Sequence, residues 1–121
     1  MAYGQVAGPD SVSLLQQPSR AIMAALAKAG KKVGDVDLFE LNEAFAAVGI
    51  ASMDDLGITD EVTNVNGGAI ALGHPLGMSG NRVLLTLINE LRRRGGGTGA
   101  AALCGGGGQG DALIIKVPSA S

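Results

Sequence analysis

The spacing of apolar and polar positions predicts a chain in which strands and helices alternate. Residues 79–94 carry apolar side chains at helical spacing, which indicates an amphipathic helix that buries one face. These apolar positions are Val83, Leu84, Leu87, Ile88 and Leu91. Residues 43–53 are apolar almost all round, which predicts a second helix that is buried on most sides.

Short apolar runs outside these helices predict strands. Residues 2–8, 36–41, 98–103 and 111–117 have the length and composition of strands. The last two form a hairpin around residues 104–110, which are mostly glycine. A short extended piece is also expected at residues 63–66, just before a long glycine-rich loop.

A further helix is expected between Pro18 and Gly30, with Ser19 as its N-cap and Gly30 as its stop. Asn42 is similarly placed to cap the helix that follows it. Because strands and helices alternate and the chain ends in a hairpin, we expect an α/β fold with a mixed sheet and helices on its faces.

Composition limits the function classes. The 121 residues have room for one domain, residues 1–121. A net charge of -2 and 2% aromatic residues argue against a nucleic-acid partner. No apolar run reaches the roughly 18 residues of a membrane span, and no signal peptide is visible, so we expect a cytoplasmic protein. Charged residues make up only 17%, so either small residues dominate the surface or another polypeptide covers part of it.

Three polar residues are candidates for chemistry. His74 is the only histidine and lies among glycines before a helix, where it could transfer protons or bind an oxyanion, or make a structural bond in a turn. Cys104 is the only cysteine and ends a predicted strand, as a reactive thiol or as a small buried side chain. Asn42 is either an N-cap or a third member of the site. One His and one Cys cannot build a closed zinc site, so no metal is expected.

The glycines after Cys104 offer bare backbone N–H groups, which suit an oxyanion hole. A strand rather than a helix follows them, which excludes a dinucleotide-binding loop. A hydrolase that pairs Cys104 with His74 as nucleophile and base would need a thiol of low pKa. The arginines at 92–94 are either a solvated helix end or ligands for coenzyme phosphates.

Three motifs together resemble the C-terminal half of a thiolase, an acetyl-CoA acetyltransferase or 3-ketoacyl-CoA thiolase. They read Asn42-Glu43-Ala44-Phe45, Gly73-His74-Pro75 and Cys104-Gly105-Gly106-Gly107. The resemblance covers nearly the whole chain. It implies a subunit of two similar halves, each with a mixed five-stranded sheet, of which this chain supplies one.

The resemblance also implies a role for each residue. His74 would activate a nucleophilic cysteine and help bind the thioester oxygen, and Cys104 would move a proton to or from the α-carbon of the second acyl group. Asn42 would hold a water of the first oxyanion hole, and the Gly106 N–H would contribute to the second. Phe45 and Leu76 would line the channel for the acyl or pantetheine group, with core packing as the other interpretation.

The implied reaction is Claisen condensation or thiolysis between CoA thioesters, which are substrates rather than permanent cofactors. The nucleophilic cysteine belongs to the N-terminal half of a thiolase, and Cys104 is the only cysteine here. We therefore expect a chain that is inactive alone and needs that half, within a homo-oligomer in the complete enzyme. The alternatives are a non-catalytic thiolase-like binding module and a truncated fragment. Met78 and Gly105 depart from the residues usual in the family, so the resemblance leaves substrate preference open.

Overall fold

The computed structural model describes residues 1–8 and 14–119. Within these residues a mixed sheet of four strands has the order β1-β4-β3-β2. Strand β2 runs parallel to β3, whereas β3 with β4 and β4 with β1 are antiparallel. The strands are β1 (Ala2–Ala7), β2 (Leu38–Leu41), β3 (Gly97–Gly105) and β4 (Gln109–Val117).

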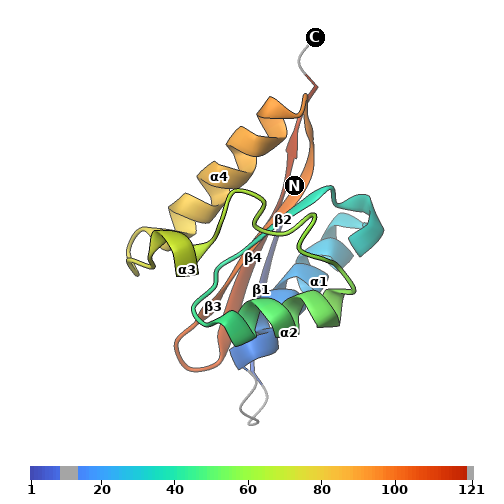
Figure 1. Ribbon diagram of the computed structural model, residues 1–121. Helices are drawn as coiled ribbons and strands as arrows, with labels where there is room; N and C mark the ends of the chain where they lie inside the picture. Colours follow the sequence, from blue (N-terminus) through green and yellow to red (C-terminus); the bar gives the residue numbers. More distant parts are fainter. Residues whose placement is uncertain (9–13, 120–121) are drawn as a thin grey trace.

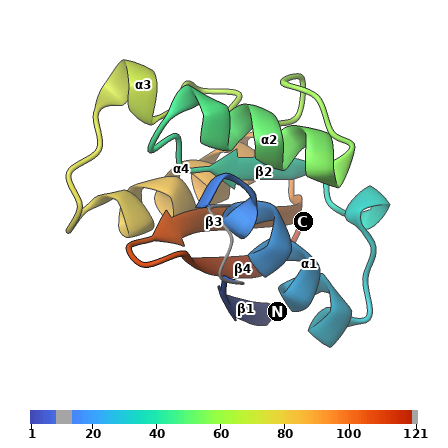
Figure 2. The same ribbon diagram turned by 90° about the horizontal axis from the view of Figure 1, so that it is seen from below.

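Helices cover both faces of this sheet. The helices are α1 (Gln17–Ala29), α2 (Ala46–Leu56), α3 (Ala69–Leu72) and α4 (Ser79–Arg93), with short 3₁₀ turns at Leu14–Gln16 and Val33–Asp35. Helix α1 packs on one face with α2 beside it, and α4 packs on the opposite face over β2 and β3 (Figures 1 and 2). The predicted α/β class with a mixed sheet is confirmed.

Alternation along β2 divides the core between the two faces. Phe39 and Leu41 pack toward α1, whereas Leu38 packs against Val83 and Leu87 of α4, and all five side chains are buried. Each such side chain contributes about 1.5–3 kcal/mol through the apolar surface that it removes from water. Strand β2 is therefore held firmly on both faces up to its last residue.

The expectation of five strands is wrong for the described residues, because the fifth strand shrinks to a single bridge. Next to β2, Thr63 pairs with Phe39 in parallel, and the backbone of Phe39 bonds to Val62 and Asn64. Asn64 then turns into the left-handed region at φ 48°, which ends the extended backbone. Its side-chain amide completes the pairing, since Oδ1 accepts from the Leu41 N–H and Nδ2 donates to the Leu41 carbonyl, both at 2.8 Å.

Two predicted helix starts are also wrong. Helix α2 begins at Ala46, so Asn42 does not cap it, and Ile50 on its outer face is 57% exposed rather than buried. Helix α1 begins at Gln17, which places Ser19 inside the first turn, where its hydroxyl donates to the Gln16 carbonyl. The predicted end of α1 is confirmed, because Gly30 adopts the left-handed conformation at φ 65°.

The hairpin is tighter than the sequence predicts. Strands β3 and β4 both extend into the predicted connection at residues 104–110, so the turn keeps only residues 106–108. Gly107 and Gly108 have φ values of 78° and 74°, which a glycine adopts without strain. The long glycine-rich loop before α4 also contains the short helix α3, which the sequence did not predict. Across the residues that are described, no helix has the length and apolar character that a membrane crossing requires.

Candidate active site

His74 lies in the loop between α3 and α4, and both ring nitrogens have partners. Nε2 lies 3.2 Å from Asn42 Nδ2, and Nδ1 lies 2.5 Å from Ser79 Oγ. Asn42 is brought there by the end of β2, and Ser79 is the first residue of α4. Gly73, at φ 97°, ends α3 and directs the chain toward this position.

These contacts define the protonation pattern of the imidazole. The Ser79 hydroxyl has one hydrogen and lies 3.2 Å from the Pro75 carbonyl, to which it donates. It must therefore accept a hydrogen bond from Nδ1–H of His74. The Asn42 amide nitrogen can only donate, so Nε2 accepts. Both contacts agree on an imidazole that carries a proton on Nδ1 and accepts a hydrogen bond at Nε2.

Asn42 is fully buried at the edge of the sheet where β2 ends. Its N–H continues the ladder by donating to the Ala102 carbonyl at 3.0 Å. Its side-chain Oδ1 is buried and makes no hydrogen bond to the described residues, so it keeps the capacity to accept one. The N-cap interpretation of Asn42 is therefore wrong, and its role as a site residue stays a prediction.

Cys104 lies near the end of β3, the strand beside β2, and therefore at the same end of the sheet as Asn42. Leu41 pairs with Ala102 in the parallel register of β2 and β3, so Asn42 and Cys104 both lie just beyond that pair. The thiol is half-buried, and burial raises its pKa above the ordinary value. A thiol with a raised pKa stays protonated at neutral pH, which suits a proton carrier and disfavours the hydrolase hypothesis. Within the described residues no hydrogen bond joins Cys104 to His74.

Gly106 is the first residue of the hairpin turn and is exposed. The turn is anchored at Gly108, whose carbonyl accepts hydrogen bonds from the Gln17 side chain at 2.5 Å and from the Gly8 N–H at 2.6 Å. Gln17 is 1% exposed, so this anchor is a buried polar contact between α1 and the turn. The turn is thus held in place while the Gly106 backbone faces outward.

Phe45 and Leu76 are 64% and 86% exposed. Core packing, the alternative interpretation of both, is therefore wrong for this chain. Phe45 follows Asn42 by three residues and Leu76 follows His74 by two, so both exposed side chains lie close to these residues in the sequence. Their role in a channel for the acyl or pantetheine group stays a prediction.

Sequence reasoning missed two polar contacts of the loops around His74. Ser79 was expected only as a helix start, although its hydroxyl holds His74. Glu43 accepts a hydrogen bond from the Ile70 N–H at 3.2 Å and so ties the Asn42 loop to α3, and a Cβ on Gly68 would collide with its carboxylate. The signals were the adjacency of Glu43 to Asn42 and the placement of Gly68 before a short apolar run.

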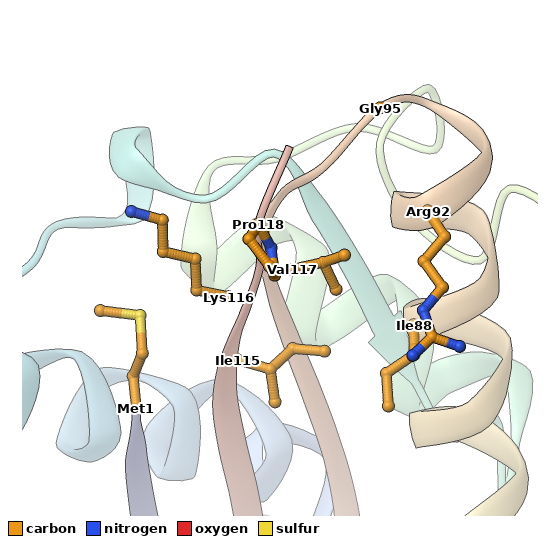
Figure 3. A pocket seen from close by; sticks show the side chains of 8 residues that line it. All are labelled: Met1, Ile88, Arg92, Gly95, Ile115, Lys116, Val117 and Pro118. Atoms are coloured by element: carbon orange, nitrogen blue, oxygen red, sulfur yellow. The ribbon is translucent and has the colours of Figure 1, made fainter. Parts of the chain in front are cut away.

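A cavity of about 670 Å³ lies at the other end of α4 from His74. Apolar side chains of β4 and α4, including Ile115 and Ile88, line it together with Arg92 and with Met1, which directly precedes β1 (Figure 3). A helix of 15 residues is roughly 22 Å long, so this cavity is too distant to belong to the His74 site. It belongs instead to an apolar surface beside α4.

The imidazole of His74, the buried amide of Asn42 and the half-buried thiol of Cys104 form a candidate site on an α/β scaffold. Residues 1–117 match the family model "Thiolase, C-terminal domain". The chain is 60% identical over 115 residues to a probable acetyl-CoA acetyltransferase of Mycobacterium leprae, covering 95% of this chain and 29% of that protein. It is 49% identical over 116 residues to a 3-ketoacyl-CoA thiolase of Aliivibrio salmonicida, covering 93% and 30%.

Among solved structures, human mitochondrial 3-ketoacyl-CoA thiolase in complex with CoA superposes with a TM-score of 0.91 at 47% identity. The match covers 100% of this chain and 30% of that chain. The chain belongs to the thiolase family and corresponds to its C-terminal domain. It spans about 30% of the length of the relatives that it matches.

Proposed function

We propose that this chain, residues 1–121, is the C-terminal half of a thiolase active site and acts in acyl transfer between CoA thioesters, by Claisen condensation or thiolysis. The observation that carries this proposal is the Nε2 lone pair of His74, held by Asn42 at the sheet edge that Cys104 also reaches. The match of residues 1–117 to the thiolase C-terminal domain, and relatives named acetyl-CoA acetyltransferase, support it. CoA and acyl-CoA are then substrates and not resident cofactors.

The geometry suggests how His74 serves two steps. Its unprotonated Nε2 exchanges the hydrogen bond from Asn42 for one from a nucleophilic thiol, which the N-terminal half of a thiolase would supply, and takes the thiol proton as that sulfur attacks the thioester carbonyl. The protonated Nε2 is then a hydrogen-bond donor and stabilises the negative oxygen beside Asn42. Removing one such donor typically costs about 3 kcal/mol of barrier.

Cys104 acts on the second acyl group. Its thiol has a raised pKa, so it holds a proton at neutral pH and can deliver it to, or as thiolate remove it from, the α-carbon. The Gly106 N–H donates to the enolate oxygen that develops in this step. Phe45 and Leu76 supply apolar surface at the channel for the acyl or pantetheine group.

The partner in this proposal is a thiolase N-terminal half, seated on the uncovered face beside α4. Helix α4 packs mainly on β2 and β3 and contacts β4 only slightly, which leaves Tyr3 and Leu113 on the sheet 46% and 38% exposed. Leu85 on the outer side of α4 is 60% exposed. Apolar surface of this kind usually marks an interface, and the relatives extend well beyond the part matched by this chain. Homo-oligomerisation of the assembled enzyme and its cytoplasmic location stay predictions.

The test is complementation. The chain is mixed with the N-terminal half of a related acetyl-CoA acetyltransferase, association is measured by sedimentation, and thiolysis of acetoacetyl-CoA is followed by the loss of its absorbance. We expect activity that falls at least about 100-fold for His74→Ala, the usual effect of losing a general base, and falls strongly for Cys104→Ser. The exposed Glu61→Ala variant is the control and should keep full activity. Association of the two halves without thiolysis would refute the catalytic proposal and favour a non-catalytic binding module.

A further inference from the structure

A buried ion pair joins the same two elements that hold His74. Glu40 precedes Asn42 by two residues and lies on the same face of β2, and Arg82 follows Ser79 on α4 by three residues. Arg82 Nη1 lies 3.5 Å from Glu40 Oε1, and the two side chains are 13% and 4% exposed. Strand β2 and helix α4 are therefore linked twice, once through His74 and once through this pair beneath it.

Stability alone does not account for this pair. Removing two charges from water costs more than their attraction returns unless further hydrogen bonds satisfy them. Glu40 Oε1 and all three guanidinium nitrogens of Arg82 lack hydrogen-bond partners within the described residues. The apolar contacts of Val83 and Leu87 already attach α4 to the sheet. The charged pair at this position thus defines the distance between β2 and α4 and adds little to the stability of the fold.

The spacing matters because His74 is held from both sides. Its Nε2 is bound by a residue at the end of β2 and its Nδ1 by a residue at the start of α4. A separation of the two elements by a fraction of an ångström would break one contact, because hydrogen bonds weaken steeply with distance and angle. The imidazole would then lose the constraint that keeps its proton on Nδ1.

We propose that Glu40 and Arg82 form a positioning pair, which fixes the distance between the end of β2 and the first turn of α4 and so keeps His74 in its Nδ1–H form, with Nε2 unprotonated and facing Asn42. This inference rests on the proposed function for its significance, since the unprotonated Nε2 is the proposed base. Its evidence is independent of catalysis, because it concerns only how His74 is held in this chain.

The single histidine makes the test direct, because its imidazole ¹⁵N signals in an NMR spectrum need no assignment. The intact chain is labelled and studied at about pH 8, where Glu40 is charged. In the native chain the signals should report the proton on Nδ1. In Arg82→Met the Nε2–H form should increase roughly fivefold, the change that loss of one ordinary hydrogen bond produces in an equilibrium. Arg82→Lys keeps the charge and should restore most of the native pattern.

Two further variants keep the result interpretable. Glu61→Gln makes the same chemical change as Glu40→Gln on an exposed side chain and should leave the His74 signals unchanged. The double variant Glu40→Gln/Arg82→Met removes both charges together, so it leaves no lone buried charge and should fold even if Arg82→Met does not. It should also show the increase in the Nε2–H form.

The proposal fails if the folded double variant keeps the native ¹⁵N pattern, or if Glu61→Gln changes it as much as the pair variants do. A purely structural role would lower the free energy of unfolding without altering the tautomer of the folded protein. The readout needs neither CoA nor a second half. Its failure would therefore leave the complementation test untouched, and a failed complementation would leave this result standing.

Discussion

The Asn64 side chain makes the hydrogen bonds to β2 that a neighbouring strand would otherwise make. Its replacement tests how much these bonds stabilise the edge strand. Its amide bonds to both backbone groups of Leu41 at 2.8 Å, and its own backbone has a φ of 48°. Leu41 is 1% exposed, so its N–H and carbonyl have little access to water. Asn64→Ala removes both bonds and leaves these two backbone groups without partners.

The expected loss follows from these contacts. Two hydrogen bonds are worth about 2 kcal/mol in net stability, and an alanine in the left-handed region adds about 1 kcal/mol of strain. The free energy of unfolding of Asn64→Ala should therefore fall by about 3 kcal/mol. Asn64→Gly loses the bonds without the strain, so it should lose about 2 kcal/mol. Asn64→Asp keeps an acceptor for the Leu41 N–H and should lose the least.

Urea unfolding followed by circular dichroism measures these differences. Asn81 is exposed on α4 and makes no side-chain hydrogen bond among the described residues, so Asn81→Ala is the matched control. That control should lie within about 0.5 kcal/mol of the native chain. A loss below about 0.5 kcal/mol for Asn64→Ala, or a larger loss for Asn64→Gly than for Asn64→Ala, would refute the assignment of the two bonds and the strain.

Local patterns predicted the parts of the fold that local physics controls. The apolar stripe of α4 and the left-handed stop at Gly30 follow from side-chain spacing and from glycine, and both agree with the structure. The number of strands could not be predicted from these patterns. In place of a fifth strand, the Asn64 side chain hydrogen-bonds to the backbone of Leu41, which is 23 positions away. The alternation of apolar and polar residues that predicts strands cannot reveal a side chain that hydrogen-bonds to a distant backbone in place of a strand.

The residues of the candidate site likewise fall into those that could be predicted from the sequence and those that could not. His74, Cys104 and Asn42 were found because a lone titratable or polar residue beside glycines or at a strand end is visible in the sequence. Ser79 and the Glu40–Arg82 pair were not found, because their roles come from tertiary contacts between β2, α4 and the His74 loop. The candidate chemical residues could be named from the sequence, whereas the residues that hold His74 in place could not.

The remaining predictions concern Gln17 and Glu40, which are buried, and Cys104, which is half-buried. Gln17→Leu removes the bond to the Gly108 carbonyl and should lower the free energy of unfolding by about 1–3 kcal/mol in urea titrations, whereas an unchanged value would show that the turn needs no anchor. Cys104 should react with iodoacetamide more slowly than a free cysteine at neutral pH and accelerate in alkaline solution, because burial raises its pKa; reaction as fast as the free thiol would contradict this. Burial raises the pKa of Glu40 from 4.5 to about 7, although Arg82 opposes the shift. Between these pH values the folded chain binds more protons than the unfolded chain, so the free energy of unfolding should fall as the pH rises, by at most about 3 kcal/mol. Glu90 works in the opposite direction, since its arginine partners lower its pKa, but its contribution is lost only below its ordinary value and thus outside this window. Glu40→Gln should abolish that part of the slope in unfolding curves measured at stepped pH, and equal slopes in the native chain and the variant would show that Glu40 ionises in the fold as it does in water.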